Sequence, residues 1–290
     1  MMNLRQIDHQ TKMASSSLTT LVMKEDGGYG NWADLPSELT SSVLSRLNTV
    51  DILENAQKVC TSWRRLCKDP ALWRKIDMRN FVVLLKIDIM NREVMCRNAV
   101  DRSLGGLLEI DIWNFGTDKL LNYIADRSSN LRILRLAMCD ESVTDDGFTK
   151  ALVKLPLLEE LEVSYSELSA ESLRVVGHSC PNLTTLKLNQ RLELEHWFVN
   201  DRDALAIALT MPRLRHLQLV GNKLSNAGLT AILHLCPDLV HLDLRCCYNV
   251  QLFGDLETRC LERIKVLRRP YDSTHDFPYF IDFGSSSEDD

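Results

Sequence analysis

The 290-residue sequence lacks the features of several large classes of protein. The uncharged apolar run from Phe81 to Leu85 stops at Lys86, and no run in the sequence approaches the length of a membrane span, because a membrane-spanning helix needs about 20 apolar residues. The first 30 residues contain no apolar stretch of signal-peptide length. The formal charge of −6 disfavours binding to a phosphate backbone, which requires clustered Lys and Arg. We therefore expect neither a membrane span nor a nucleic-acid partner.

Recognisable catalytic motifs are also missing. No G-x-S-x-G, H-E-x-x-H, Walker-type or dinucleotide-binding motif occurs. None of the nine cysteines forms a C-x-x-C pair, and Cys180 and Cys236 each precede a proline at the same phase of a repeat. This usage is typical of reduced thiols that serve as small apolar residues, in the nucleus or the cytoplasm. We expect a protein that is not an enzyme and that has no cofactor or metal site.

What the sequence does contain is a repeated six-residue phrase. An apolar residue is followed by two variable residues, an apolar residue, one variable residue and an apolar residue, as in Leu131-Arg-Ile-Leu134-Arg-Leu136. The seven copies begin at Leu107, Leu131, Leu158, Leu183, Leu214, Leu239 and Leu261. All steps except that from Leu183 to Leu214 lie within the roughly 20 to 29 residues of a leucine-rich repeat. The alternation predicts strands with one buried face.

The segments between these phrases predict a helix in each repeat. Apolar residues at helical spacing follow a capping residue, and four of these segments end near Pro156, Pro181, Pro212 and Pro237. Strand, helix and proline in repeated order predict an α/β solenoid with a parallel sheet on its concave side and helices on its convex side. We assign this solenoid to residues 107–267.

A separate helical region is expected before the repeats. Pro36 stands where a helix would begin, and Leu39, Val43, Leu44 and Leu47 recur at helical spacing after it. Two further helical patterns end at Asp69-Pro70, because proline disfavours a helical residue before it. The result is a three-helix unit over residues 31–78.

This unit resembles the F-box. The matching features are Leu35-Pro36 followed by Glu38-Leu39, the run Val59-Cys60-x-x-Trp63-Arg64-x-Leu66, and Asp69-Pro70-x-Leu72-Trp73. The resemblance implies docking to a Skp-type adaptor and, through it, to a cullin and a RING protein. It places seven residues at or just behind the adaptor surface: Leu35, Pro36, Leu39, Leu44, Leu47, Ile52 and Leu53. For Val59, Cys60, Trp63 and Leu66 an ordinary helical core is favoured.

The whole chain is similar to the plant F-box/leucine-rich-repeat proteins with cysteine-containing repeats. The features shared with that group are the run Ala99-Val-Asp-Arg-Ser103, the Cys-Pro-x-Leu joints and the run Leu242-Asp-Leu-Arg-Cys-Cys-Tyr-Asn249. Membership implies a substrate-recognition subunit of an SCF-type ubiquitin ligase, in which the repeats bind a protein target of unknown identity. The alternative is a repeat-based binding or inhibitor module outside a ligase.

The remaining segments complete the expected organisation. Residues 1–30 are predicted to be disordered. Residues 79–106 are expected to form a linker and a helix that ends at Gly105-Gly106 and caps the end of the solenoid. Residues 268–290 are interpreted as a tail in which Phe277, Tyr279 and Phe280 fold back on the last repeat.

Target binding is assigned to variable strand residues, which point away from the core. The candidates are Asp111, Trp113, Arg135, Glu160, Glu162, Lys187, His216, Gln218, His241, Asp243, Arg245 and Arg263. They predict a surface that is acidic in the early repeats and basic in the last two, with His216 and His241 side by side. Trp113 is either an exposed anchor or a residue packed on the capping helix. Trp197 and Phe198, in the long fourth repeat, either contact the target or cover a neighbouring helix.

Overall fold

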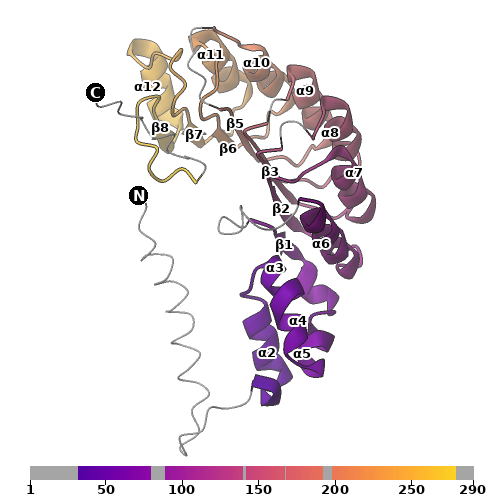
Figure 1. The fold of residues 1–290 in the computed structure, drawn as a ribbon. Helices are drawn as coiled ribbons and strands as arrows, with labels where there is room; N and C mark the ends of the chain where they lie inside the picture. Colours follow the sequence, from indigo (N-terminus) through magenta and orange to yellow (C-terminus); the bar gives the residue numbers. More distant parts are fainter. Residues whose placement is uncertain (1–31, 80–88, 140–141, 167, 192–197, 279–290) are drawn as a thin grey trace, which may run out of the picture. The chain divides into compact units, whose positions relative to one another are not determined.

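The computed structural model describes residues 32–79, 89–139, 142–166, 168–191 and 198–278. The chain forms two compact units, Met1–Asp69 and Pro70–Asp290. The described part of the first unit, residues 32–69, is helical (Figure 1). Its elements are η1 (Trp32–Asp34), α2 (Ser37–Leu44), α3 (Thr49–Asp51), the π-helical turn η2 (Ile52–Ala56), α4 (Gln57–Val59) and α5 (Thr61–Leu66).

Local sequence explains where the helices of the first unit begin and end. Pro36, with φ of −53°, lies directly before α2. The Asn48 side chain accepts a hydrogen bond from the Asp51 amide at 2.8 Å and caps α3. Cys60, with φ of −157°, separates α4 from α5. The buried Leu44, Trp63 and Cys67 belong to the core of this unit.

The second unit contains a parallel sheet in which the strands follow chain order. The strands are β1 (Lys75–Asp77), β2 (Glu109–Trp113), β3 (Ile133–Ala137), β4 (Glu160–Ser164), β5 (Thr185–Asn189), β6 (His216–Gln218), β7 (His241–Asp243) and β8 (Val266–Arg268). The helices are η3 (Pro70–Trp73), α6 (Ile89–Arg102), α7 (Asp118–Arg127), α8 (Asp145–Leu152), α9 (Ala170–Ser179), α10 (Arg202–Thr210), α11 (Asn226–Leu235) and α12 (Gly254–Arg263). Figure 1 shows helices α7 to α11 along the outer side of this unit and the strands on the inner side.

The repeat phrase therefore identified the solenoid, and its strands β2 to β7 lie where predicted. Two ends differ from the prediction. Strand β1 was missed, although Trp73-Arg-Lys-Ile76-Asp-Met78 is a further copy of the phrase, with all three apolar residues buried. Strand β1 pairs with β2 through Ile76 opposite Ile110.

The last predicted strand was out of phase by three residues. Leu261 and Arg263 belong to helix α12, and β8 begins at Val266, opposite His241 of β7. Leu261 and Val266 are apolar but 54% and 46% exposed. Because they are apolar, the prediction took them for core positions of the phrase. The prediction that Arg263 lies on the sheet was wrong, because its side chain instead donates to the Leu233 carbonyl oxygen at 2.6 Å.

Helix α6 is not an end cap, contrary to the prediction. It connects β1 to β2 and lies beside α7 in Figure 1, as the helix of a normal repeat does. Glu93 of α6 accepts a hydrogen bond from the Thr117 hydroxyl, which caps α7, at 3.2 Å. Met95, Cys96, Ala99 and Val100 are buried, so the helix contributes to the core.

Carboxylates near the starts of the outer helices connect successive repeats. Asp118 of α7 accepts hydrogen bonds from the amide and hydroxyl of Thr144, at 2.8 and 2.7 Å, and Thr144 caps α8. Asp201, which precedes α10, binds Ser225, the cap of α11, in the same way. Each carboxylate thus fixes the cap of the next helix.

The nine cysteines are free, and eight of them are buried. This matches their predicted use as small apolar residues. Within the described ranges, no helix is long and apolar enough to cross a bilayer. The same ranges contain no group of three or more His, Cys, Asp or Glu residues able to hold a metal ion.

Candidate binding surfaces

The seven predicted adaptor residues divide into an outer and an inner set. Pro36 is exposed, Leu39 and Leu47 are 52% and 37% exposed, and Leu35 is half-buried. The inner set is buried and consists of Leu44, Ile52 and Leu53. An exposed apolar surface on a small helical unit is typical of an interaction site.

The predicted core residues of this unit also divide. Trp63 is buried, and its indole nitrogen donates to the Trp32 carbonyl oxygen at 3.2 Å. The two indole rings meet edge to face at 6.3 Å. Val59, however, is 51% exposed, so the prediction of a core position was wrong for this residue.

On the open face of the sheet, variable residues of neighbouring strands lie in rows, as predicted. One row contains Asp77, Asp111, Arg135, Glu162, Lys187, Gln218, Asp243 and Arg268. A parallel row contains Lys75, Glu109, Ile133, Glu160, Thr185, His216, His241 and Val266. The parallel register places acidic and basic side chains directly beside one another.

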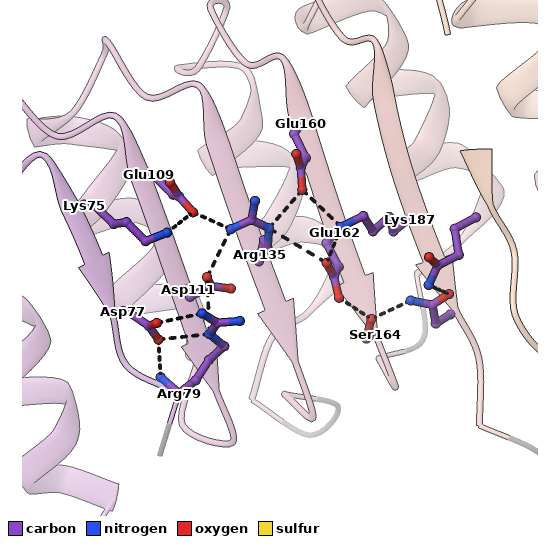
Figure 2. Close-up of polar contacts among 12 residues, drawn as sticks. Lys75, Asp77, Arg79, Glu109, Asp111, Arg135, Glu160, Glu162, Ser164 and Lys187 are labelled. Atoms are coloured by element: carbon purple, nitrogen blue, oxygen red, sulfur yellow. Dashed lines mark hydrogen bonds and ion pairs between the residues drawn. The ribbon is translucent and has the colours of Figure 1, made fainter. Parts of the chain in front are cut away.

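Arg135 is the centre of an ion network on this face (Figure 2). Its Nη1 lies 2.5 Å from Glu109 and 3.1 Å from Asp111. Its Nε lies 2.9 Å from Glu160 and 3.9 Å from Glu162. The Arg135 side chain is only 18% exposed, so water screens these interactions less than it screens ion pairs on an open surface.

Three more cations extend the network at its two sides. Lys187 lies 3.2 Å from both Glu160 and Glu162. Lys75 binds Glu109 at 2.9 Å, and Arg79 binds Asp77 at 2.7 Å and approaches Asp111 at 3.6 Å. The five carboxylates and four cations nearly cancel. The predicted acidic surface of the early repeats was therefore wrong, because sequence reasoning missed Lys75 and Arg79 together with β1.

Among the described residues, the basic candidates of the last repeats, Arg245 and Arg263, do not form the predicted basic surface, for a similar reason. Arg245 is buried and is bound by Asp243 at 2.6 Å and Asp276 at 2.5 Å. Arg263 lies on α12 instead of on the sheet. Arg268, which was not among the candidates, occupies the strand position and also binds Asp276, at 3.1 Å.

Burial affects the carboxylates of the network unequally. It raises the pKa of Glu160, but hydrogen bonds and charges from Arg135 and Lys187 outweigh this effect, so the pKa lies below the usual range. Burial raises the pKa of Asp111 to about 6 despite the opposing charges of Arg79 and Arg135. The Asp111 Oδ1 atom is buried without a hydrogen-bond partner. Asp111 is consequently the least well compensated carboxylate of the network.

This difference predicts a pH-dependent effect of Asp111→Asn. The raised pKa means that Asp111 contributes stability below about pH 4, and that this contribution is lost as the pH rises through about 6. Asparagine cannot ionise. Between pH 4 and pH 7, the unfolding free energy of the variant should therefore rise by about 2–3 kcal/mol relative to that of the wild type.

Urea unfolding at pH 4 and pH 7 measures this change. The control is Asp146→Asn, because Asp146 is 74% exposed and pairs with Lys150 on the helix surface. Surface ion pairs contribute about 0–1 kcal/mol, so the control should change little at either pH. A difference between Asp111→Asn and wild type that is the same at both pH values would contradict the prediction.

His216 and His241 lie side by side, as predicted. Their rings stack with centroids 4.3 Å apart and an interplanar angle of 25°. Burial, together with the nearby charges of His241 and Arg215, lowers the pKa of His216. The lowered pKa favours the neutral form of the His216 side chain at neutral pH.

The aromatic candidates have different environments. Trp113 is 6% exposed and belongs to a buried cluster with Ala137, Val220 and Phe277. It is thus no exposed anchor. Phe277 packs on this cluster, and its ring centroid lies 5.8 Å from the guanidinium carbon of Arg245, which follows β7. Tyr279 and Phe280 lie outside the described residues.

The long fourth repeat contributes an exposed aromatic residue. Phe198 is 70% exposed, so its ring is not packed into the protein. Its carbonyl oxygen accepts a hydrogen bond from the Asn249 side chain at 3.5 Å. Trp197 lies outside the described residues.

Comparisons with known proteins agree with this architecture. The F-box-like family model matches residues 32–79, and a leucine-rich-repeat model matches residues 211–233. The Arabidopsis thaliana protein named F-box protein SKIP19 is 61% identical over 278 residues, which cover 96% of this chain and 88% of that protein. The chain belongs to the F-box/leucine-rich-repeat protein family.

A further relative and a solved structure are similar to this chain over different shares of their length. Putative F-box/LRR-repeat protein 23 of Arabidopsis thaliana is 56% identical over 274 residues. This match covers 93% of the present chain and 59% of the relative. The structure of the yeast Rad7 and Elc1 complex has a TM-score of 0.40 and 13% identity, with 92% of each chain covered.

Proposed function

We propose that this chain is the substrate-recognition subunit of an SCF-type E3 ubiquitin ligase. The F-box unit docks a Skp-type adaptor, which links it to cullin and the RING protein, and the repeat sheet binds the target protein. Family membership supports the general role. The observation that carries the docking assignment is the exposed apolar surface of Pro36, Leu39 and Leu47, at the positions that F-box resemblance selects.

This function requires no chemistry from the chain itself. A ligase receptor increases the reaction rate by holding a target lysine near the charged conjugating enzyme, which is a proximity effect. The nearly compensated charges of the sheet suit a binding face. Rows of alternating acidic and basic groups select a partner with the complementary order and disfavour others by placing like charges opposite each other.

Adaptor docking is tested with Pro36→Ala/Leu39→Ala. Both side chains are exposed, so the double variant should fold normally while losing apolar contact area with the adaptor. We expect at least a roughly tenfold loss of adaptor co-purification, equivalent to about 1.4 kcal/mol of binding free energy. The measurement is quantitative co-purification of a Skp-type adaptor with the full chain.

The matched control is Leu209→Ala, because Leu209 is 64% exposed on helix α10 of the repeat unit. This variant should retain the adaptor. Wild-type adaptor recovery by Pro36→Ala/Leu39→Ala would refute the docking surface. Adaptor recovery without cullin would instead support a binding or inhibitor module outside a ligase.

A further inference from the structure

A row of residues at the C-terminal ends of the strands forms an apolar surface at the rim of the sheet. Trp113, Ala137 and Ser164 are paired in register across β2, β3 and β4. Trp113 and Ala137 form a buried cluster with Val220, and Met138 and Tyr165 pack against it. We call Trp113, Ala137, Met138, Tyr165 and Val220 the rim patch.

The backbone after β3 and after β4 has the same conformation and contributes one residue of the patch in each case. Met138 and Tyr165 follow β3 and β4 directly and have φ of 56° and 55°. This left-handed conformation is uncommon for residues other than glycine. It turns the chain away from the sheet and places a large apolar side chain at the rim, beside the small side chains of Ala137 and Ser164.

The ring of Phe277 covers the rim patch. Phe277 is 5% exposed and meets Tyr165 edge to face, with ring centroids 6.5 Å apart and an interplanar angle of 84°. This geometry is the preferred arrangement of two aromatic rings. A single aromatic side chain thus covers the patch.

Arg245 recognises the residue before this ring as well as the ring itself. Its Nη1 donates to Asp276 at 2.5 Å and to the Ser273 carbonyl oxygen at 3.1 Å. Its guanidinium carbon lies 5.8 Å from the centroid of the Phe277 ring. Asp243 holds the other side of the guanidinium. A buried, oriented arginine thus faces an acidic residue and an aromatic residue that are adjacent in sequence.

Residues 271–278, which contain Asp276 and Phe277, are held to the sheet by a few side-chain contacts. Residues 271–278 form neither helix nor strand. Arg245, Arg268 and the Phe277 ring hold this segment, and the Asp276 side chain remains 48% exposed. Segments that depend on a few side-chain contacts open locally at much lower free energy than the core does.

We propose that the rim patch and Arg245 bind a short segment of the target protein in which Asp or Glu directly precedes Phe or Tyr. Asp276–Phe277 occupies this site intramolecularly, and the target displaces it. The acidic side chain of the target binds the Arg245 guanidinium, and its ring takes the place of Phe277 against Tyr165. That the bound segment belongs to a ligase target rests on the proposed function, whereas the existence of the site is inferred from these contacts alone.

The intramolecular occupant sets the affinity for a competing segment. If the site is open for only a fraction of the time, the apparent dissociation constant increases by the reciprocal of that fraction. Emptying the site in the full chain should therefore strengthen binding in trans. The two substitutions Asp276→Ala and Phe277→Ala empty it without altering the rim patch or Arg245.

The experiment is fluorescence anisotropy with a labelled peptide of residues 272–278, Asp-Ser-Thr-His-Asp-Phe-Pro. The full-length Asp276→Ala/Phe277→Ala variant should bind this peptide at least about tenfold more tightly than wild type. Replacing the Phe of the peptide by Ala, or its second Asp by Asn, should abolish this gain. The control His275→Ala changes an exposed neighbour and should bind the peptide as wild type does.

Absence of peptide binding to the emptied variant, with its circular dichroism and cooperative thermal transition unchanged, would overturn the proposal. If that variant fails to fold, Asp276→Asn keeps the ring in place and should bind the peptide several-fold more tightly than wild type. Equal affinities would then reject the site. The assay contains neither adaptor nor cullin, so its outcome is independent of the Pro36→Ala/Leu39→Ala test.

Discussion

Replacing Arg135 with methionine should lower the unfolding free energy at pH 7 by about 2–4 kcal/mol, because it leaves partly buried carboxylates without their shared cation. Glu109, Asp111 and Glu160 all lie within 3.1 Å of the guanidinium. Methionine preserves much of the aliphatic packing, so the loss reports on the charge. Chemical denaturation at pH 7 provides the measurement.

Two comparisons make this prediction specific. Arg132→Met removes an arginine from the same repeat that pairs with Glu159, where both side chains are 46% exposed, and it should cost no more than about 1 kcal/mol. At pH 4 the deficit of Arg135→Met should shrink, because carboxylates without their cation protonate more readily and then no longer repel one another. Equal losses for the two variants would show that the network does not stabilise the sheet.

A second large effect is expected at a glycine. In Gly147→Ala, the new Cβ would lie 2.0 Å from the Asp118 carboxylate, far inside any tolerated contact. Alanine is favoured over glycine in a helix by about 1 kcal/mol. Displacing Asp118 disrupts its two bonds to Thr144, and charge-assisted bonds contribute about 1.5–3 kcal/mol each. The loss from displacing Asp118 is larger than the gain in helix propensity, so we expect the unfolding free energy to fall by about 2 kcal/mol.

A double-mutant cycle separates this clash from other effects of the methyl group. In an Asp118→Ala background the obstructing carboxylate is gone, so Gly147→Ala should be neutral or stabilising. The two substitutions should thus show a favourable coupling of at least about 1 kcal/mol in thermal or chemical unfolding. If the losses of unfolding free energy from the two substitutions simply add, the effect of Gly147→Ala does not arise from a clash with Asp118. Gly228 stands in the same relation to Asp201, with 2.3 Å to its Oδ1.

The solenoid could be predicted because one requirement recurs in each of its repeats. Every strand must bury a leucine-like residue at fixed spacing, and Leu134, Leu161 and Leu186 indeed share one buried row. The same alternation placed the residues of β2 to β7 on the opposite face correctly. Hence Arg135, Glu160 and His216 were assigned to the binding face from sequence alone.

The first and last strands of the repeat unit were harder to predict. Where exposed residues are also apolar, the phrase fits the sequence in more than one position. Leu261 and Val266 completed a false copy, while strand β8 ends at Arg268 and is followed by Arg269, where the phrase requires an apolar residue. At the other end, Trp73 was assigned to the F-box, which concealed the copy that forms β1. The adaptor and target roles of the predicted residues remain predictions.

The charge and burial of residues on the open face of the sheet depended on contacts that the sequence pattern does not contain. Compensation of the acidic residues required Lys75 and Arg79, on and beside the missed strand. The burial of Trp113 required Phe277, more than 150 positions away in the sequence. Strand alternation gives the direction of a side chain and says nothing about a distant segment that covers it.

The carboxylates that join successive helix caps also suggest where the repeat unit would come apart. Asp118 and Asp145 bind the caps of the following helices, but Ala170 stands at the corresponding position of α9 and offers no acceptor. Strand pairing also shortens at this point, from five residue pairs between β4 and β5 to three between β5 and β6. The junction between α9 and α10 therefore lacks the carboxylate link that joins the preceding repeats, and its cohesion depends on the apolar stacking of neighbouring repeats and on three strand pairs.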